Sequence, residues 1–118
     1  MKRVVTEPPD VIHAHCAYPD GYVAQRLGKL WNRPVYITVH GYDVHELPKL
    51  NPRWRELICD ALTGADRVVS VSDELASGVL EMGVGEERVL RLPNGVDCDL
   101  FPPRAERERR VPQILFVG

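Results

Sequence analysis

The stretch "VYITVHGYDVHE", residues 35–46, contains a hydrophobic strand that ends abruptly in polar residues. Its first five residues are the β-branched and aromatic types that pack well in a pleated sheet. A histidine, a glycine and an aspartate follow at His40, Gly41 and Asp43. The pattern predicts a buried strand with titratable groups at its carboxyl end. It leaves open whether "HGYD" is a metal site, a phosphate site or a turn.

Further strands and helices alternate along the chain on both sides of this stretch. The expected strands are 11–15, 35–40, 67–72 and 88–93, and the expected helices are 20–32, 52–63 and 73–82. Asn51 and Ser72 are the expected caps of the second and third helices. Because strands separated by such helices require right-handed crossovers, the sequence predicts an α/β fold with a parallel sheet and flanking helices. The nearly continuous apolar runs further predict that helices cover both faces of the sheet.

The composition is that of an ordinary globular chain with one core. The chain has 118 residues, a formal net charge of −2 and 44% hydrophobic residues. No basic face interleaved with aromatic residues occurs, so we expect no nucleic-acid partner. The cysteines Cys16, Cys59 and Cys98 are odd in number and widely spaced, which favours reduced thiols. No apolar run suits a signal peptide or a membrane span, so we expect a soluble, cytoplasmic protein.

Polar residues occur at the carboxyl end of each of the four expected strands. They are His13 and His15, then His40 and Asp43, then Ser70 and Ser72, and finally Asn94 and Asp97. Because ligands of parallel α/β sheets bind outside this edge, the convergence predicts a cleft there. Gly41 would allow a positive φ or a close approach of ligand to backbone, and Asn94-Gly95 is typical of a turn. Ordinary polar loops are the alternative, since loops begin at the same edge.

The spacing of His13 and His15 raises the alternative of a metal site. Both side chains lie on one face of a strand, and neutral imidazole is a common zinc ligand. His40, Asp43 and His45 are further candidate ligands of a metal-dependent hydrolase. However, the sequence has too few strand–helix units for an eight-stranded barrel, and it contains no H-E-x-x-H motif. We therefore expect no metal, with one histidine of the pair packed in the sheet and the other near the cleft.

Five segments follow one another along the chain with β-α spacing. They are "DVIHAHCAYPDGYVAQRLGKL", "PVYITVHGYD", "ADRVVSVSDELASGVLEMGV", "VLRLPNGVDCDLF" and "ILFVG", and together they extend over residues 10–118. In their order they resemble glycosyltransferase family 4, a family of retaining enzymes that use nucleotide sugars and have the two-domain GT-B architecture. The resemblance implies part of the N-terminal, acceptor-binding Rossmann-like domain. Bacterial members that build polysaccharides are the most similar.

The resemblance implies three regions along the chain. Residues 1–101 are part of the N-terminal domain, 102–112 are an interdomain linker rich in proline and charge, and 113–118 are the first strand of a truncated C-terminal domain. The glycine-rich first loop and the E-x7-E segment of the family are both missing. We therefore expect a fragment that transfers no sugar alone. The missing strands would leave a sheet edge exposed, so we also expect self-association.

The resemblance gives His40 a catalytic role, because the histidine of the family's H-G-x-D motif lies in the interdomain cleft near the transferred sugar. A histidine there can donate a hydrogen bond to a sugar hydroxyl or stabilise developing charge. Asp43 would orient His40 or a hydroxyl of the acceptor. The remaining expected substrate contacts are Gly41 and His15, together with Asn94, Gly95 and Asp97 on the cleft floor.

The implied partners are a nucleotide-sugar donor, bound mainly by the missing C-terminal domain, and a glycan or small-molecule acceptor. The resemblance implies no cofactor and no metal, and it is compatible with peripheral membrane association of the whole enzyme. A second hypothesis is a non-catalytic α/β module that binds carbohydrate or a protein partner. The metal-dependent hydrolase is the third.

Overall fold

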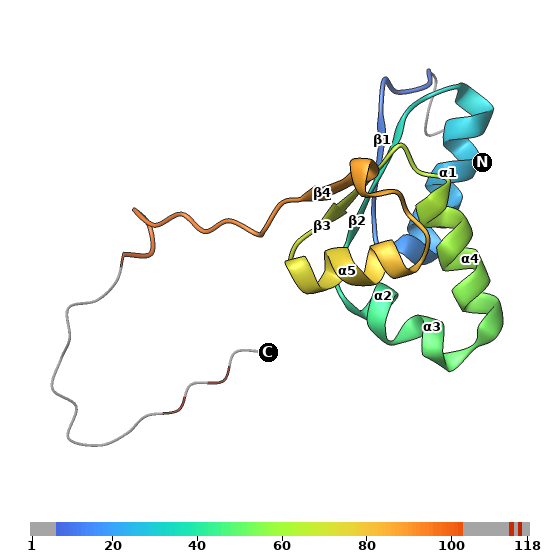
Figure 1. Ribbon diagram of the computed structural model, residues 1–118. Helices are drawn as coiled ribbons and strands as arrows, with labels where there is room; N and C mark the ends of the chain where they lie inside the picture. The colour runs from blue at the N-terminus through green and yellow to red at the C-terminus, as the bar shows by residue number, and fades with distance from the viewer. Residues whose placement is uncertain (1–6, 103–113, 115, 117–118) are drawn as a thin grey trace, which may run out of the picture.

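The sheet of this chain has four parallel strands in the order β1-β2-β3-β4. The structure is a computed structural model that describes residues 7–102, 114 and 116. The strands are β1 (Ile12–His15), β2 (Val35–Val39), β3 (Arg67–Ser70) and β4 (Val89–Arg91), and the main helices between them are α1 (Tyr22–Trp31), α4 (Pro52–Thr63) and α5 (Asp73–Glu81). The predicted α/β fold, a parallel sheet with flanking helices in a Rossmann-like arrangement, is confirmed (Figure 1).

Short helical turns lie between these elements and were not predicted. They are the irregular turn η1 (Ala17–Gly21), the single turns α2 (Tyr42–His45) and α3 (Leu47–Leu50), and the 3-10 turn η2 (Glu86–Arg88). A four-residue helix is too short to show helical periodicity in a sequence. The "HGYD" stretch is therefore the start of a helical turn rather than an open loop. The last strand is also shorter than expected, since β4 ends at Arg91.

The predicted helix caps are confirmed. The side chain of Asn51 accepts a hydrogen bond from the backbone N–H of Arg53 at 2.8 Å, and α4 begins at the next residue, Pro52. The Ser72 hydroxyl accepts one from the N–H of Leu75 at 3.2 Å and so caps α5. Among the described helices, none is long and apolar enough to cross a lipid bilayer.

The helices of the described chain pack on one face of the sheet. They form the core with the side chains that alternate onto that face, which are Ala14, Val35, Ile37, Val39, Val68 and Val89. The strands occur in the sheet in their chain order, so each right-handed crossover turns back on the same side. The prediction that helices cover both faces is therefore wrong for the described residues.

The opposite face of the sheet has a mixed polar and apolar surface. In register across the strands it carries His13, His15, Tyr36, Thr38, Arg67, Val69 and Leu90. None of these side chains belongs to the core that the helices cover. The two histidines and Leu90 are exposed, whereas Thr38 and Val69 in the middle are buried. Valine and threonine on this face made the strands look buried on both sides in the sequence.

The predicted linker 102–112 and the predicted strand 113–118 fall almost entirely outside the described residues. Of these positions the structure describes Pro102, Ile114 and Phe116, which are exposed and have no regular secondary structure. The boundary after residue 101 therefore stays a prediction, as do the identities of the two segments that follow.

Candidate functional site

Three histidines gather at the carboxyl ends of β1 and β2. Nδ1 of His15 lies 2.9 Å from Nε2 of His40, and the two rings stack with their centroids 5.2 Å apart. The His13 ring is 4.8 Å from that of His15, and its Nε2 lies 2.8 Å from Oγ1 of Thr38. All three histidines are exposed, so the prediction that one of the pair packs in the sheet is wrong. The cause is the open face, which has no helix to bury them.

The contact between His15 and His40 restricts the protonation of the two rings. One ring has to donate an N–H and the other has to accept on a lone pair, so at least one of them is neutral. No hydrogen bond among the described residues uses Nδ1 of His40, and the ring is exposed. This nitrogen can therefore donate to, or accept from, a hydroxyl group of a ligand.

The five candidate metal ligands do not converge. Among the described residues no group of three histidine, cysteine, aspartate or glutamate side chains is arranged to hold a metal ion. His45 lies apart from the other histidines, with its Nε2 3.8 Å from Oε1 of Glu74 on α5. The Asp43 carboxylate is buried and occupied by backbone donors. This geometry gives the metal-dependent hydrolase no support.

Asp43 fixes the backbone at the end of two strands. Its Oδ2 accepts a hydrogen bond from the N–H of Ala17 at 2.8 Å, and its Oδ1 accepts from the N–H groups of His40 and Gly41, both at 3.1 Å. The side chain is buried, with 3% of its surface exposed. Asp43 therefore positions His40 through the backbone and ties the start of η1 to the turn after β2. It offers no exposed oxygen to an acceptor hydroxyl.

Two residues at this edge have a positive φ. Gly41 has a φ of 124°, which glycine adopts without a steric penalty. Cys16 has a φ of 74° and a ψ of 139°, which is strained for a residue with a side chain. Such conformations cost on the order of 1–3 kcal/mol and cluster at functional sites. The strain is held by the N–H of Cys16, which donates to the Thr38 carbonyl at 2.8 Å, and by Asp43 at the following residue.

The thiol of Cys16 is kept in its neutral form. Burial raises its pKa above the usual 9.0, and the negative charges of Asp43 and Asp20 raise the pKa further. The thiolate is thus disfavoured around neutral pH, and Cys16 contributes no charge to this edge of the sheet.

His40 lines two pockets. The first, which we call the histidine pocket, has a volume of about 330 Å³ and is lined by His13, His15, Thr38, His40, Val69, Val71, Leu92, Pro93, Asn94 and Gly95. The second, the aromatic pocket, has a volume of about 370 Å³ and is lined by Cys16, Tyr18, Pro19, His40, Tyr42, Asp43, Leu47 and Trp54. The structure thus brings His15, His40, Asn94 and Gly95 together, and His40 contributes to both pockets.

Asp97 does not line either pocket. Its carboxylate accepts hydrogen bonds from the N–H groups of Asp99 and Leu100, both at 3.0 Å, and so caps the turn that follows it.

The Asn94-Gly95 pair was expected to form a turn, and this expectation is wrong. Residues 92–97 contain no turn, and the φ of Gly95 is not positive. This segment is extended instead, and Asn94 reaches the pocket wall from it.

The aromatic residues of the second pocket were missed as site residues. Trp54 lies within the expected helix 52–63, and its side chain is half-buried. Tyr42 is the variable residue of the H-G-x-D motif, and Tyr18 begins the "YPDG" segment after the two histidines. For Tyr18 and Tyr42, the signal that could have found them is their proximity to the histidine motifs. Trp54 has no such signal, because periodicity alone assigns it to a helix.

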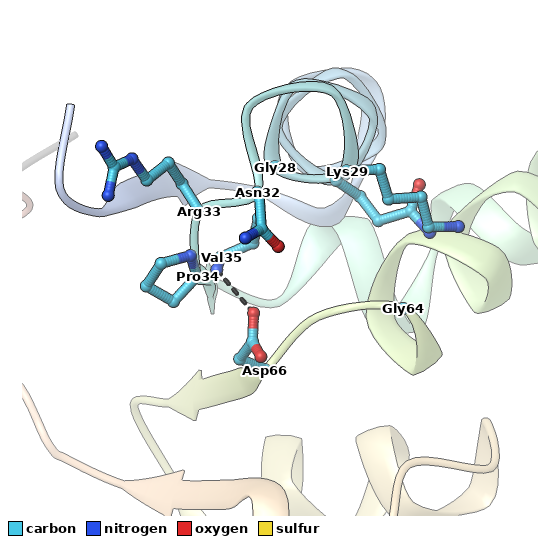
Figure 2. Close-up of a pocket in the computed structure, with 9 residues that line it drawn as sticks. Gly28, Lys29, Asn32, Arg33, Pro34, Val35, Gly64 and Asp66 are labelled. Atoms are coloured by element: carbon cyan, nitrogen blue, oxygen red, sulfur yellow. Dashed lines mark hydrogen bonds between the residues drawn. The ribbon is translucent and has the colours of Figure 1, made fainter. Parts of the chain in front are cut away.

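A further hollow lies at the opposite, amino edge of the sheet (Figure 2). Its lining includes Gly28, Lys29, Gly64 and Asp66, and Oδ2 of Asp66 accepts a hydrogen bond from the N–H of Val35 at 2.8 Å. A Cβ atom at Gly28 would collide with Val35, and one at Gly64 would collide with Gln25. This edge is therefore built around close helix–strand packing without stacked histidines, and its positive φ of 51°, at Asn32, is the left-handed conformation that commonly ends a helix.

Comparison with known proteins agrees with the motifs. Residues 1–100 match the model of Glycosyltransferase Family 4, so the chain belongs to this family. A protein of Bacillus subtilis (strain 168) described as "Putative teichuronic acid biosynthesis glycosyltransferase TuaC" is 28% identical to it over 103 residues. The match covers 87% of this chain and 26% of that relative, so the chain spans about a quarter of the relative's length.

Proposed function

We propose that this chain is the acceptor-side part of a retaining glycosyltransferase, which transfers a sugar from a nucleotide-sugar donor to an acceptor in polysaccharide or glycoconjugate biosynthesis. Family membership supports the reaction class, and the likeness to a protein named for teichuronic acid biosynthesis supports a glycan-building role. The observation that carries the proposal is the exposed His40 ring, held by His15 in the lining of two pockets at the ligand-binding edge of the sheet.

In this proposal His40 contacts the transferred sugar. Its free Nδ1 donates a hydrogen bond to a sugar hydroxyl or accepts one from it, while the contact with His15 holds the ring in one orientation. Asp43 acts as a positioning residue, because it binds the His40 backbone rather than a substrate. Asn94 and Gly95 form the far wall of the histidine pocket, where they would contact the donor side of the cleft.

The chain alone is proposed to be inactive. Retaining transfer requires that the leaving diphosphate be stabilised while the acceptor hydroxyl is held close to the donor sugar. At the His40 edge the described residues offer imidazoles and an asparagine, but neither pocket contains a lysine or an arginine to hold a diphosphate. Those groups would come from a second domain facing this edge.

The test compares the 118-residue chain with a fusion in which the C-terminal half of the Bacillus subtilis relative follows residue 112. Both are incubated with a panel of radiolabelled nucleotide sugars and glycan acceptors. We expect transfer by the fusion and none by the chain alone. Because His40 would contact the transferred sugar, His40→Ala should lower the fusion's rate by about 100-fold or more. His45→Gln is the matched control for loss of a histidine away from the site. Turnover by the chain alone, or equal rates for the two variants, would refute the proposal.

A further inference from the structure

The aromatic pocket beside His40 is lined almost entirely by carbon atoms. Its walls come from Tyr18 on η1, Tyr42 on α2 and Trp54 on α4, with Pro19 and Leu47 between them. Its volume of about 370 Å³ lies within the roughly 300–1,000 Å³ of small-molecule sites. Four elements, η1, α2, α3 and α4, thus converge to form an apolar hollow in direct contact with the proposed catalytic histidine.

The two polar residues deepest in this wall cannot serve a polar ligand well. The Asp43 carboxylate is 3% exposed and already accepts three backbone hydrogen bonds. The Cys16 thiol is a weak hydrogen-bonding group, and burial and the nearby carboxylates raise its pKa, so it carries no charge. The pocket therefore has no lysine or arginine for a phosphate, and the polar atoms of Tyr18, Tyr42, Trp54 and His40 make up only a small part of its surface.

These properties decide between a sugar ring and a hydrocarbon group as the occupant. A hydroxyl buried without a hydrogen-bond partner loses its hydration without compensation, and a sugar would bury several. A hydrocarbon group instead gains stability with each CH₂ that it buries. We propose that the aromatic pocket binds a hydrocarbon group of the acceptor, so that the acceptor is an amphiphile. The assignment of this ligand as the acceptor rests on the proposed function above.

The position of the pocket sets where the reacting end of such an acceptor lies. His40 lines both the aromatic pocket and the histidine pocket, so an acceptor whose apolar part fills the first pocket brings its next group close to His40. Tyr42 is 62% exposed at the rim, whereas Trp54 is half-buried inside. The apolar part is thus held between Trp54 and Tyr42, and the acceptor hydroxyl lies at His40.

The test measures binding to the 118-residue chain without any donor. Octyl β-glucoside, kept below its micelle concentration, is compared with methyl β-glucoside, which has the same sugar and almost no hydrocarbon. The signal is the fluorescence of Trp54, isolated by Trp31→Phe. We expect octyl β-glucoside to bind at least about tenfold more tightly than methyl β-glucoside. Tyr42→Ser should weaken binding of the octyl compound at least threefold.

Leu50→Ser is the matched control, because Leu50 is 63% exposed and does not line the pocket, although it lies on α3 with Leu47. Circular dichroism shows whether the variants remain folded. Equal binding of the two glucosides, or equal weakening by the two serine variants, would overturn the inference. The inference and the proposed function can fail independently. Sugar transfer by the fusion without a preference for alkyl acceptors would reject the inference alone. Binding of the octyl compound while the fusion transfers nothing would reject the proposed function alone.

Discussion

At both edges of the sheet an aspartate accepts backbone hydrogen bonds and joins neighbouring strands, but the surfaces of the two edges are very different. At the amino edge, Asp66 accepts the backbone N–H of Val35 and so joins the start of β2 to that of β3. At the carboxyl edge, Asp43 accepts three backbone N–H groups and joins the ends of β1 and β2. Each aspartate connects neighbouring strands, but only the second lies beneath exposed histidines.

The contrast between the two edges favours a ligand site at the carboxyl edge over one in the hollow at the amino edge. At the amino edge, Gly28 and Gly64 allow side chains to pack against the backbone, and the hollow lies beside that contact (Figure 2). At the carboxyl edge, Gly41 has empty space around it and Cys16 holds a strained conformation. Close packing accounts for the two glycines of the first arrangement. The carboxyl edge has exposed imidazoles and a strained backbone. Neither feature stabilises the fold, which is typical of a functional site.

The largest effect on stability is expected for replacement of Asp43, and a much smaller one for replacement of Asp66. Asp43→Asn should lower the free energy of unfolding by about 3 kcal/mol or more, because the amide NH₂ would face a buried backbone donor and two further bonds would lose their charge. Asp66→Asn should cost about 1 kcal/mol, since Asp66 is exposed and water can replace its single bond. Urea unfolding with unchanged m values measures both. Equal losses would show that Asp43 is not the anchor described here.

A smaller effect is expected for the two glycines singled out in the sequence. Gly41→Ala should cost about 1–2 kcal/mol through its φ of 124° alone, because an added Cβ would have no atom within 4 Å. Gly95→Ala also adds a Cβ in open space but at an ordinary φ, so its cost should stay below about 0.5 kcal/mol. Thermal unfolding of the two variants provides the comparison. A costly Gly95→Ala would mean that the Asn94-Gly95 turn forms after all.

The smallest expected effect concerns the protonation of Cys16. Since alkylating reagents attack the thiolate, the raised pKa of Cys16 should make it react more slowly than the exposed Cys98 at pH 8 in a Cys59→Ser background. Its folded-state pKa exceeds the unfolded value of about 9.0, so the folded chain holds this proton more tightly. Stability from this group is therefore full below pH 9 and declines as the pH rises through it. Mass spectrometry of the alkylated peptides measures the rates, and faster labelling of Cys16 would contradict the assignment.

Much of the fold could be predicted from the sequence because its signals are local. Helix periodicity and the caps Asn51 and Ser72 located α4 and α5 almost to the residue. The coverage of the sheet could not be predicted, since it depends on the order of strands in space and not on their apolar content. The single turns α2 and α3 were also missed, because four residues are too few for a pattern.

The candidate site was predictable only in part, because several of its contacts join residues that are far apart in the sequence. The edge containing His15, His40 and Asn94 follows from strand polarity, which the sequence does show. The role of Asp43 could not be inferred, because its three partners are backbone N–H groups, two just after β2 and one from η1. Trp54 joins the pocket from a distant helix, and a helical stripe gives no hint of that contact.

The central claim is that the carboxyl edge, and not the amino edge, contacts the substrate. The most direct measurement is the sugar-transfer rate of the fusion with His40→Ala at one edge and Lys29→Ala at the other, where Lys29 lines the amino-edge hollow. We expect the transfer rate to fall by about 100-fold or more for His40→Ala and to change by less than about twofold for Lys29→Ala. Equal rates for the two variants, or a larger loss with Lys29→Ala, would contradict it.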